Sequence, residues 1–431
     1  MLTRNCSTGA VLAFFAAFAL SLMACPSTTG PTYHTDVAPL LQRECMSCHQ
    51  AGGIGTFPLT TYAEAKARKD LISFSVSSRR MPPGILDNSG DCQTFPGARW
   101  LDDSEIALLT AWADNDAPEG PVPTDIIKPL PLLGLQGDGI VDVAMAEPYT
   151  PESTEQEAND DYRCFILDPE RLTDSWLTGY EILPGVPSEV HHMLLFSLLD
   201  TDADNEAQAK DDADPRPGYG CFGDAGVDNT NLLAVWAPGR DAVTYPEGTG
   251  LFVPAGHKLV MQLHYNLLSG VAPDLTALRL RFADRVQKDA LLVSLADENL
   301  ALEGGLPEAN YSFTVPLLGL PEPLEMHGAF PHMHTLGRTL TFTRQPIADQ
   351  TGEQQECLAH VPNWDFNWQE VAFYDAPILV DGGDRLDVSC TFDTSSRSED
   401  VSWGEGTQDE MCLVFVYVTR ENGQRVVELI D

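Results

Sequence analysis

The spacing of apolar and polar positions changes after residue 118. Before that point, the stretch ARWLDDSEIALLTAWADNDAPEG (98–120) has Leu108, Leu109 and Trp112 at helical spacing. We expect an amphipathic helix there, capped by Asp103 or Ser104. Downstream, runs such as KLVMQLHYNLL, LTALRLRFAD and MCLVFVYVTR alternate or are wholly apolar, and Gly, Pro, Asp and Asn separate them. That pattern is typical of antiparallel β-strands.

These two patterns predict a multidomain chain. A small all-α domain would occupy residues 31–118, and a Pro-rich linker would follow at 119–136. The remaining β part has about 300 residues, more than one sandwich needs. We therefore expect two all-β antiparallel sandwiches, the first at residues 137–285 and the second at 286–431.

The first 25 residues predict an export signal. Arg4 supplies a positive start, VLAFFAAFALSLMA is apolar, and Cys25 follows the small Ala24. The residues LMAC resemble the lipobox of bacterial lipoproteins, which implies a lipid anchor on Cys25 and a place in the periplasm or outer membrane. Ordinary cleavage after Ala24 is the alternative, and the apolar stretch is short for a membrane-spanning helix.

The charge and the cysteines fit an exported, soluble protein. A net charge of −39 argues against nucleic acid or an anionic membrane surface as a partner. In an oxidising compartment, an even number of cysteines outside the motifs predicts disulfides, although spacing alone does not give their connectivity. Six cysteines remain in this way: Cys92, Cys164, Cys221, Cys357, Cys390 and Cys412.

The acidic stretch LDTDADNEAQAKDDADPRPG begins like a calcium loop. Asp200, Asp202 and Asp204 alternate, but Asn205 stands where such a loop needs glycine. We expect a solvated surface loop without metal.

A C-x-x-C-H motif indicates covalent haem attachment. Cys45 and Cys48 can each reach one vinyl group, and His49 is then delivered to the iron. A zinc site would need a second ligand pair, and none follows nearby. Met81, in SSRRMPPGIL, is the candidate sixth ligand on a loop stiffened by two prolines, or else a core residue. The segment resembles class I cytochromes c, so the predicted all-α domain would be cytochrome c-like and carry one haem c.

Histidine and methionine residues recur in the β part. Because successive side chains in a strand point to opposite faces, the adjacent His191 and His192 can share a site only at a bulge or a strand end. His332 and His334 have the spacing that puts both rings on one side of a strand. Singly, such residues are more often core, but imidazoles combined with one thioether suit copper. The set comprises His191, His192, His264, His332, His334 and Met411.

The order of these motifs resembles one family. HHMLLF, MQLHY, H-x-H followed by TLG, and DEMC occur in the order found in copper type II monooxygenases, the family of peptidylglycine α-hydroxylating monooxygenase and dopamine β-monooxygenase. The resemblance runs from about Gly137 to the C-terminus and implies two jelly-roll-like sandwiches with one copper each. It implies that His191, His192 and His264 bind an electron-transfer copper. It also implies that His332, His334 and Met411 bind the oxygen-activating, catalytic copper.

The resemblance also bears on the disulfides. Cys164 and Cys221 fall where the family closes a bridge in the first sandwich, and Cys390 and Cys412 where it closes one in the second. Cys92 and Cys357 are left, either paired across domains or free.

Three positions differ from the peptide-hydroxylating member of the family. That member holds a peptide carboxylate with an Arg, an Asn and a Tyr, where this chain has Phe330, Leu413 and Phe415. These side chains offer no charge-assisted hydrogen bond. We therefore expect a small neutral or aromatic substrate rather than a peptide.

The resemblance and the haem motif together predict an exported monooxygenase that hydroxylates a C–H bond with dioxygen. Hydroxylation needs two further electrons, which the fused haem would pass on from a reduced cytochrome or an ascorbate-like reductant. The alternative is a periplasmic haem and copper electron carrier without oxygenase activity. Met411 argues against a carrier, because a carrier has no need of a second, open copper site.

Overall fold

The architecture comes from a computed structural model. It describes residues 30–420 except 52, 54, 84–85, 126, 131–133, 154–159, 237–241, 268–269, 318–319, 321, 348–354, 367, 370 and 405–407. The predicted export signal and Cys25 lie outside the described residues. From Pro31 onward the chain forms one compact unit.

Most helices lie before residue 118. They are a π-helix at Tyr33–Val37, α1 Ala38–Glu44, α2 Tyr62–Ala67, α3 Lys69–Ser77 and α4 Asp103–Asp114. They share a core around Leu41, Leu109 and Trp112. The helix expected near Leu108 is confirmed as α4, but its cap is Asp102, whose carboxylate accepts from the Glu105 backbone N–H.

The predicted fold class, with a cytochrome c-like all-α domain in front of the β part, is wrong. The described residues are mostly β-sheet, and their five α-helices are short, the longest having 13 residues. Between α3 and α4, Leu86 and Phe95 pack into a core made mainly of β-strands. Apolar side chains of this segment are therefore shared with the sheets, so one amphipathic helix did not indicate a separate helical domain.

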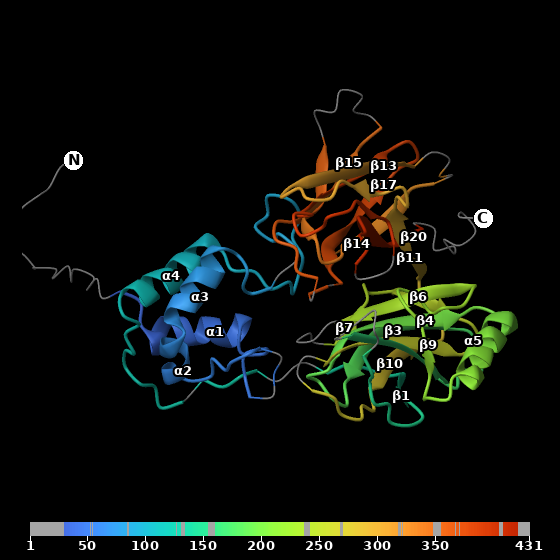
Figure 1. Cartoon of the computed structure of the whole chain (residues 1–431), viewed down its shortest axis with the longest axis horizontal. Coiled ribbons are helices and arrows are strands. Elements are labelled where there is room, and N and C mark those ends of the chain that lie inside the picture. The colour runs from blue at the N-terminus through green and yellow to red at the C-terminus, as the bar shows by residue number, and fades with distance from the viewer. Residues whose placement is uncertain are drawn as a thin grey trace, which may run out of the picture. The chain divides into compact units, whose positions relative to one another are not determined.

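The strands fall into two β regions. The first β region comprises β1 Ile140–Ala144, β2 Asp160–Leu167, β3 Ser175–Leu183, β4 Val190–Leu198, β5 Tyr219–Gly220, β6 Thr230–Trp236, β7 Val243–Thr244, β8 Thr249–Val253, β9 Leu259–Asn266 and β10 Ala277–Ala283. The second β region comprises β11 Lys288–Ala296, β12 Ala301–Leu302, β13 Ala309–Pro316, β14 Leu324–His332, β15 Gly337–Gln345, β16 Glu356–Val361, β17 Phe373–Val380, β18 Arg385–Phe392, β19 Val401–Ser402 and β20 Leu413–Arg420. Figure 1 colours the first region green to yellow and the second orange to red.

One sheet continues through both β regions. Its nine strands follow the order β1-β10-β3-β8-β11-β20-β14-β17, with β7 beside β3. The step from the first region to the second is the parallel pairing of β8 with β11, in which Thr249 lies opposite Lys288. The β content fits the predicted monooxygenase part of the chain.

Smaller sheets complete each β region. The five-stranded sheet β5-β2-β9-β4-β6 shares a core with β3, β8 and β10. The four-stranded sheet β13-β18-β15-β16 shares a second core with β14 and β20. Strands β12 and β19 form a separate pair. Each region thus buries apolar side chains between two sheets.

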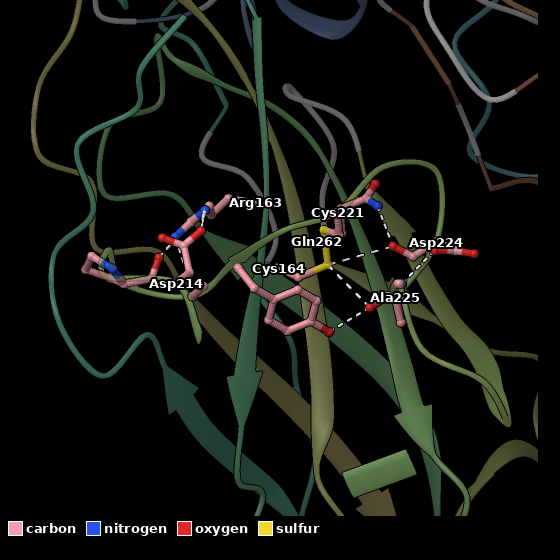
Figure 2. The surroundings of a disulfide bond; sticks show 11 residues. Arg163, Cys164, Asp214, Cys221, Asp224, Ala225 and Gln262 are labelled. Atoms are coloured by element: carbon pink, nitrogen blue, oxygen red, sulfur yellow. Dashed lines mark hydrogen bonds and ion pairs between the residues drawn. A yellow bond between two sulfur atoms is a disulfide. The ribbon is translucent and has the colours of Figure 1, made fainter. Parts of the chain in front are cut away.

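Three disulfides are formed. Cys164–Cys221 and Cys390–Cys412 confirm the predicted pairs. The question left open by the sequence is answered by a third bond, Cys92–Cys357, which joins the segment between α3 and α4 to β16. Figure 2 shows the first pair beside Gln262 of β9, whose side-chain amide donates to the Asp224 carbonyl over 2.6 Å.

The acidic stretch expected as a surface loop is a helix, α5 Thr201–Ala213. Asp200 caps it by accepting from the Ala203 backbone N–H, and Ala203 and Ala207 are buried. Because Ala203 and Ala207 are four residues apart, they give the helix an apolar face. The many acidic residues of the stretch had suggested a loop instead. Among all described residues, no helix is both long and apolar enough to cross a membrane.

Candidate metal centres

Three histidines of the first β region form a cluster. His191 and His192 lie on β4 and His264 on β9. One ring nitrogen from each lies within 4.8 Å of the others. The Nδ1 atom of His264 is 3.1 Å from Nδ1 of His191 and 3.2 Å from Nδ1 of His192. Three nitrogens that converge in this way suit a cation better than shared protons.

A bulge brings the adjacent histidines to one side. Val190 lies opposite Tyr265 and His192 opposite His264, so the pairing of β4 with β9 shifts register at His191. The extra residue changes the direction of the side chain. This is the bulge that the doubled histidine predicted.

Asp160 fixes the orientation of His264. The Nε2 atom of His264 lies 2.9 Å from a carboxylate oxygen of Asp160. When Nε2–H donates to this oxygen, Nδ1 keeps its lone pair for a metal. The ring also stacks on Tyr162 at a centroid distance of 4.2 Å.

Burial keeps the imidazoles of His192 and His264 neutral. It holds the pKa of His192 and the pKa of His264 well below the ordinary histidine value, and neighbouring histidines lower both further. Only a neutral imidazole offers a lone pair to a metal. The cluster is thus ready to bind a cation at neutral pH.

The second group lies at the end of β14. The ring centroids of His332 and His334 are 5.1 Å apart. His332 Nδ1 lies 3.0 Å from the side-chain oxygen of Gln369, and His334 Nδ1 lies 3.1 Å from the Asp409 carbonyl. With Nδ1–H donating to these oxygens, a metal would be bound through Nε2 of each ring. Burial lowers the pKa of His332 to about 3.

Met411 lines the same cavity as these two histidines, just before β20. Its neighbour Glu410 is fully buried, and its carboxylate accepts from the backbone N–H of His334 and of Leu336. Burial nevertheless raises the pKa of Glu410 to about 7. On the other side, Cys412 is bonded to Cys390. Both neighbours therefore hold Met411 close to the histidine pair.

This cavity has a volume of about 340 Å³ and is lined by residues of both groups, including His192. The three positions that differ from the peptide-hydroxylating enzyme, Phe330, Leu413 and Phe415, all line it. The volume suits a small ligand.

Phe366 lies between the two groups. Its ring centroid is 6.4 Å from that of His191 and 5.8 Å from that of His334. Trp364, nearby in the chain, donates its indole N–H to the His334 carbonyl over 2.9 Å. Phe366 thus contacts both candidate metal sites, and Trp364 contacts the second.

A larger cavity of about 530 Å³ surrounds the C-x-x-C-H motif. Its walls include Cys45, Cys48, His49 and Met81, and both cysteines are free thiols. His49 Nδ1 lies 2.8 Å from the Phe57 carbonyl, which leaves Nε2 as the ligand atom. His191 of the first group lines this cavity as well.

Three supporting residues were not predicted from the sequence: Asp160, Gln369 and Glu410. Each is a common polar residue without a motif around it. Each meets a histidine from another strand or loop, at sequence separations of 104, 37 and 76 residues. No local pattern indicates such contacts.

Comparison with known proteins agrees with the site geometry. Residues 315–425 match the family described as copper type II ascorbate-dependent monooxygenase, C-terminal domain. The matched segment contains His332, His334 and Met411.

The similarity to individual relatives covers more of the chain than residues 315–425. A tyramine beta-hydroxylase of Caenorhabditis briggsae is 26% identical over 251 residues, which cover 55% of this chain and 40% of the relative. The human DBH-like monooxygenase protein 1 is 26% identical over 273 residues, 57% of this chain and 42% of the relative. A dopamine beta-hydroxylase of Rattus norvegicus is 24% identical over 283 residues, 59% of this chain and 43% of the relative. The match thus spans less than half of each relative. Residues 315–425 thus match the C-terminal domain of copper type II ascorbate-dependent monooxygenases, and a longer part of the chain is similar to oxidoreductases of the dopamine and tyramine beta-hydroxylase kind.

Proposed function

We propose that this chain is an exported copper-dependent monooxygenase that hydroxylates a C–H bond of a small aromatic or neutral molecule with dioxygen. The observation that carries the proposal is one cavity bordered by two groups of neutral imidazoles, with a thioether in the second group. The family match of residues 315–425 supports it.

The donor atoms fit two copper ions. His191, His192 and His264 would hold the first through converging nitrogens. His332, His334 and Met411 would hold the second, and a thioether favours the reduced ion. Bound copper would supply one-electron redox chemistry and activate dioxygen at the second site. The role of the protein is to keep the imidazoles neutral, fix their tautomers through Asp160 and Gln369, and exclude bulk water.

The shape of the cavity supports an aromatic substrate. Phe222, Phe330, Phe366 and Phe415 line it, and a flat ring would pack well against such walls. The related enzymes named for tyramine and dopamine act on aromatic compounds.

The larger cavity fits a covalently attached haem. Two free thiols, an imidazole oriented by Phe57, and the apolar side chains of Leu41, Leu59 and Ile72 line it. Met81, 39% exposed, would be the sixth ligand. Bound haem would supply electrons one at a time. His191 lines this cavity and also belongs to the first histidine cluster, so it connects the proposed haem site with that cluster.

Export and lipid anchoring complete the proposal. Three disulfides suit an oxidising compartment, and the LMAC sequence would place the lipid on Cys25. A reduced cytochrome or an ascorbate-like compound outside the cytoplasm would then be the electron donor.

Metal analysis and an isotope experiment test the proposal together. Protein matured in a periplasm should contain one haem iron and two coppers per chain. With a reductant and ¹⁸O₂, it should place one labelled oxygen atom in an arylalkyl substrate, and the His332→Ala protein should not. Iron and copper without labelled product from a broad aromatic panel would favour an electron carrier instead.

A further inference from the structure

Phe366 is in ring contact with one histidine of each group. Its ring centroid lies 6.4 Å from that of His191 at an interplanar angle of 30°, and 5.8 Å from that of His334 at 79°. Aromatic rings pack directly against each other when their centroids are about 4.5–7 Å apart. Because His191 belongs to the first group and His334 to the second, Phe366 joins one candidate copper ligand of each site through packed atoms.

Neighbouring residues hold Phe366 on the second group. Trp364 is buried, and its indole N–H donates to the His334 carbonyl over 2.9 Å. Gln369 donates its side-chain N–H to the Phe366 carbonyl over 3.2 Å, and its side-chain oxygen lies 3.0 Å from Nδ1 of His332. These contacts come from both sides of Phe366 in the chain. They fix its ring relative to the second group, from which the ring reaches across to the first.

The cavity of about 340 Å³ offers the other route between the two groups. His192, His332 and Met411 line it, so candidate ligands of both sites also border one space that water, dioxygen or substrate can enter. Phe366 lies in the wall of this cavity. Electron tunnelling weakens with distance, and it weakens faster across a solvent-filled space than through packed protein atoms, which leave few gaps. The ring contacts of Phe366 therefore favour the wall over the open space as the path of an electron.

We propose that Phe366 carries electron transfer from the first candidate copper site to the second, along a path from His191 through the phenyl ring to His334. This inference rests on the proposed function, because it requires copper at both sites. One electron leaves Cu(I) of the first site, which becomes Cu(II), and reduces Cu(II) of the second site to Cu(I). The phenyl ring is neither oxidised nor reduced, and no proton moves. Phe366 is thus a positioning residue that acts through two ligand imidazoles.

Phe366→Leu tests the path, because it keeps an apolar side chain but removes the ring that contacts both imidazoles. Elemental analysis should still find two coppers per chain. In the absence of dioxygen and substrate, a flash-generated reductant then supplies less than one electron per fully oxidised chain. EPR spectra of samples frozen at intervals follow the Cu(II) signals of the two sites as the electron moves between them.

The rate and the end point of this transfer should respond differently. The rate that does not depend on protein concentration is the rate of transfer within one chain, and it should fall several-fold in Phe366→Leu. The final intensities of the two Cu(II) signals should stay the same, because the ligands that set both potentials are unchanged. A merely structural role would alter the copper content or the final intensities instead. Equal rates in Phe366→Leu and the unmodified protein, with two coppers in each, would overturn the inference.

Phe222→Leu is the matched control. Phe222 lines the same cavity, and its ring packs on Tyr162 of the first β region at a centroid distance of 4.4 Å. The variant makes the same replacement of an aromatic by an aliphatic side chain, but it leaves the ring of Phe366 in place. Its transfer rate should equal that of the unmodified protein. A fall as large as in Phe366→Leu would show that the cavity sets the rate, and the inference would be wrong.

Phe366→Tyr covers the case in which Phe366→Leu fails to fold. It keeps the aromatic ring and adds only a hydroxyl group, so the transfer rate should stay close to that of the unmodified protein. A several-fold fall with both coppers bound would contradict a path through the ring. Absence of two coppers from the unmodified protein would instead refute the proposed copper sites themselves, so the two failures are distinguishable.

Discussion

The two histidine groups offer opposite ring nitrogens to a metal. In the first, Nδ1 atoms converge, and His264 Nε2 is engaged by Asp160. In the second, Nδ1 of His332 and Nδ1 of His334 lie beside oxygen atoms, so a metal would be bound through Nε2. The first group lies on paired strands, whereas the second lies where β14 ends and loops begin.

This difference suits two separate tasks. Three imidazoles on adjacent strands have little freedom to rearrange, as an electron-transfer metal requires. A site at a strand end, with one thioether and a cavity of about 340 Å³ beside it, leaves room for dioxygen and a substrate. The supports differ accordingly: a carboxylate within the sheet for the first group, and a disulfide with loop contacts for the second.

The largest expected effect is loss of one metal alone. His264→Ala removes the nitrogen on which the other two converge, so copper should fall from about two to about one per chain. Elemental analysis and the copper EPR spectrum would measure this. His257→Ala is the control, since His257 bonds Asp204 over 2.6 Å and belongs to neither group. Two full coppers in His264→Ala would refute the first site.

The disulfide beside each histidine group should contribute a different amount to the free energy of unfolding. Replacing Cys164 and Cys221 by serine opens a loop of 57 residues and should cost about 4 kcal/mol of unfolding free energy. Replacing Cys390 and Cys412 opens a loop of 22 residues and should cost about 3 kcal/mol. Urea unfolding with copper titration would compare them. Only the second variant should weaken copper at the second site, because only Cys412 adjoins Met411.

An ion pair between a buried arginine and a partly exposed aspartate supports the strand beside the first group. Arg163 of β2 is fully buried and donates to Asp214 over 2.7 Å, as Figure 2 shows. Asp214→Asn leaves the guanidinium without its counter-charge and should cost about 3 kcal/mol of unfolding free energy. Asp284→Asn is the control, because Asp284 is 85% exposed and its pair with Arg171 should contribute little.

The same pair makes a pH prediction. Arg163 holds the pKa of Asp214 well below its ordinary value, so the folded chain binds this proton less readily than the unfolded chain. The contribution therefore begins to fall near the pKa of Asp in the unfolded chain, about 4, and is lost completely only below the lower pKa of the folded chain. The difference between the urea midpoints of the Asp214→Asn and unmodified proteins should become smaller from pH 6 to pH 3. A constant difference across that range would contradict the assignment.

The smallest expected effects lie in the supporting residues. Asp160→Asn should weaken copper at the first site, and Gln369→Leu at the second, by about 10–100-fold each. Competitive copper titrations would measure both constants in each variant. Each variant is the control for the other, and a loss at both sites would show that the two groups are not independently supported.

Short sequence patterns were sufficient to predict features that depend on both the residue type and the spacing of neighbouring residues. The doubled histidine predicted the bulge at His191, and two of the three disulfides followed from the family resemblance. The apolar side chains of Phe330, Leu413 and Phe415 do line the cavity beside His332. Strand alternation fixes which side chains share a face, so such features can be predicted residue by residue.

The prediction of a separate helical domain was wrong because it also relied on a local pattern. The period of α4 was detected correctly, but periodicity does not say which core an apolar face joins. Leu86 and Phe95 joined the β core, and Cys92 bonded Cys357 at a separation of 265 residues. Likewise, the nine-stranded sheet depends on the parallel pairing of β8 with β11, and no turn motif in the sequence predicts this pairing.

By itself, the sequence determined which side chains are able to bind metal or haem, because thiol, imidazole and thioether chemistry is fixed by residue type and short spacing. Tertiary structure alone decided which nitrogen each imidazole presents. That choice depends on Asp160, Gln369 and the Asp409 carbonyl, which reach the histidines from distant strands and loops. It also placed Phe366 between the two groups, and it placed His191 in the walls of the larger cavity beside the C-x-x-C-H motif. Contacts between residues far apart in the chain have no period and no motif, so only the folded arrangement can create them.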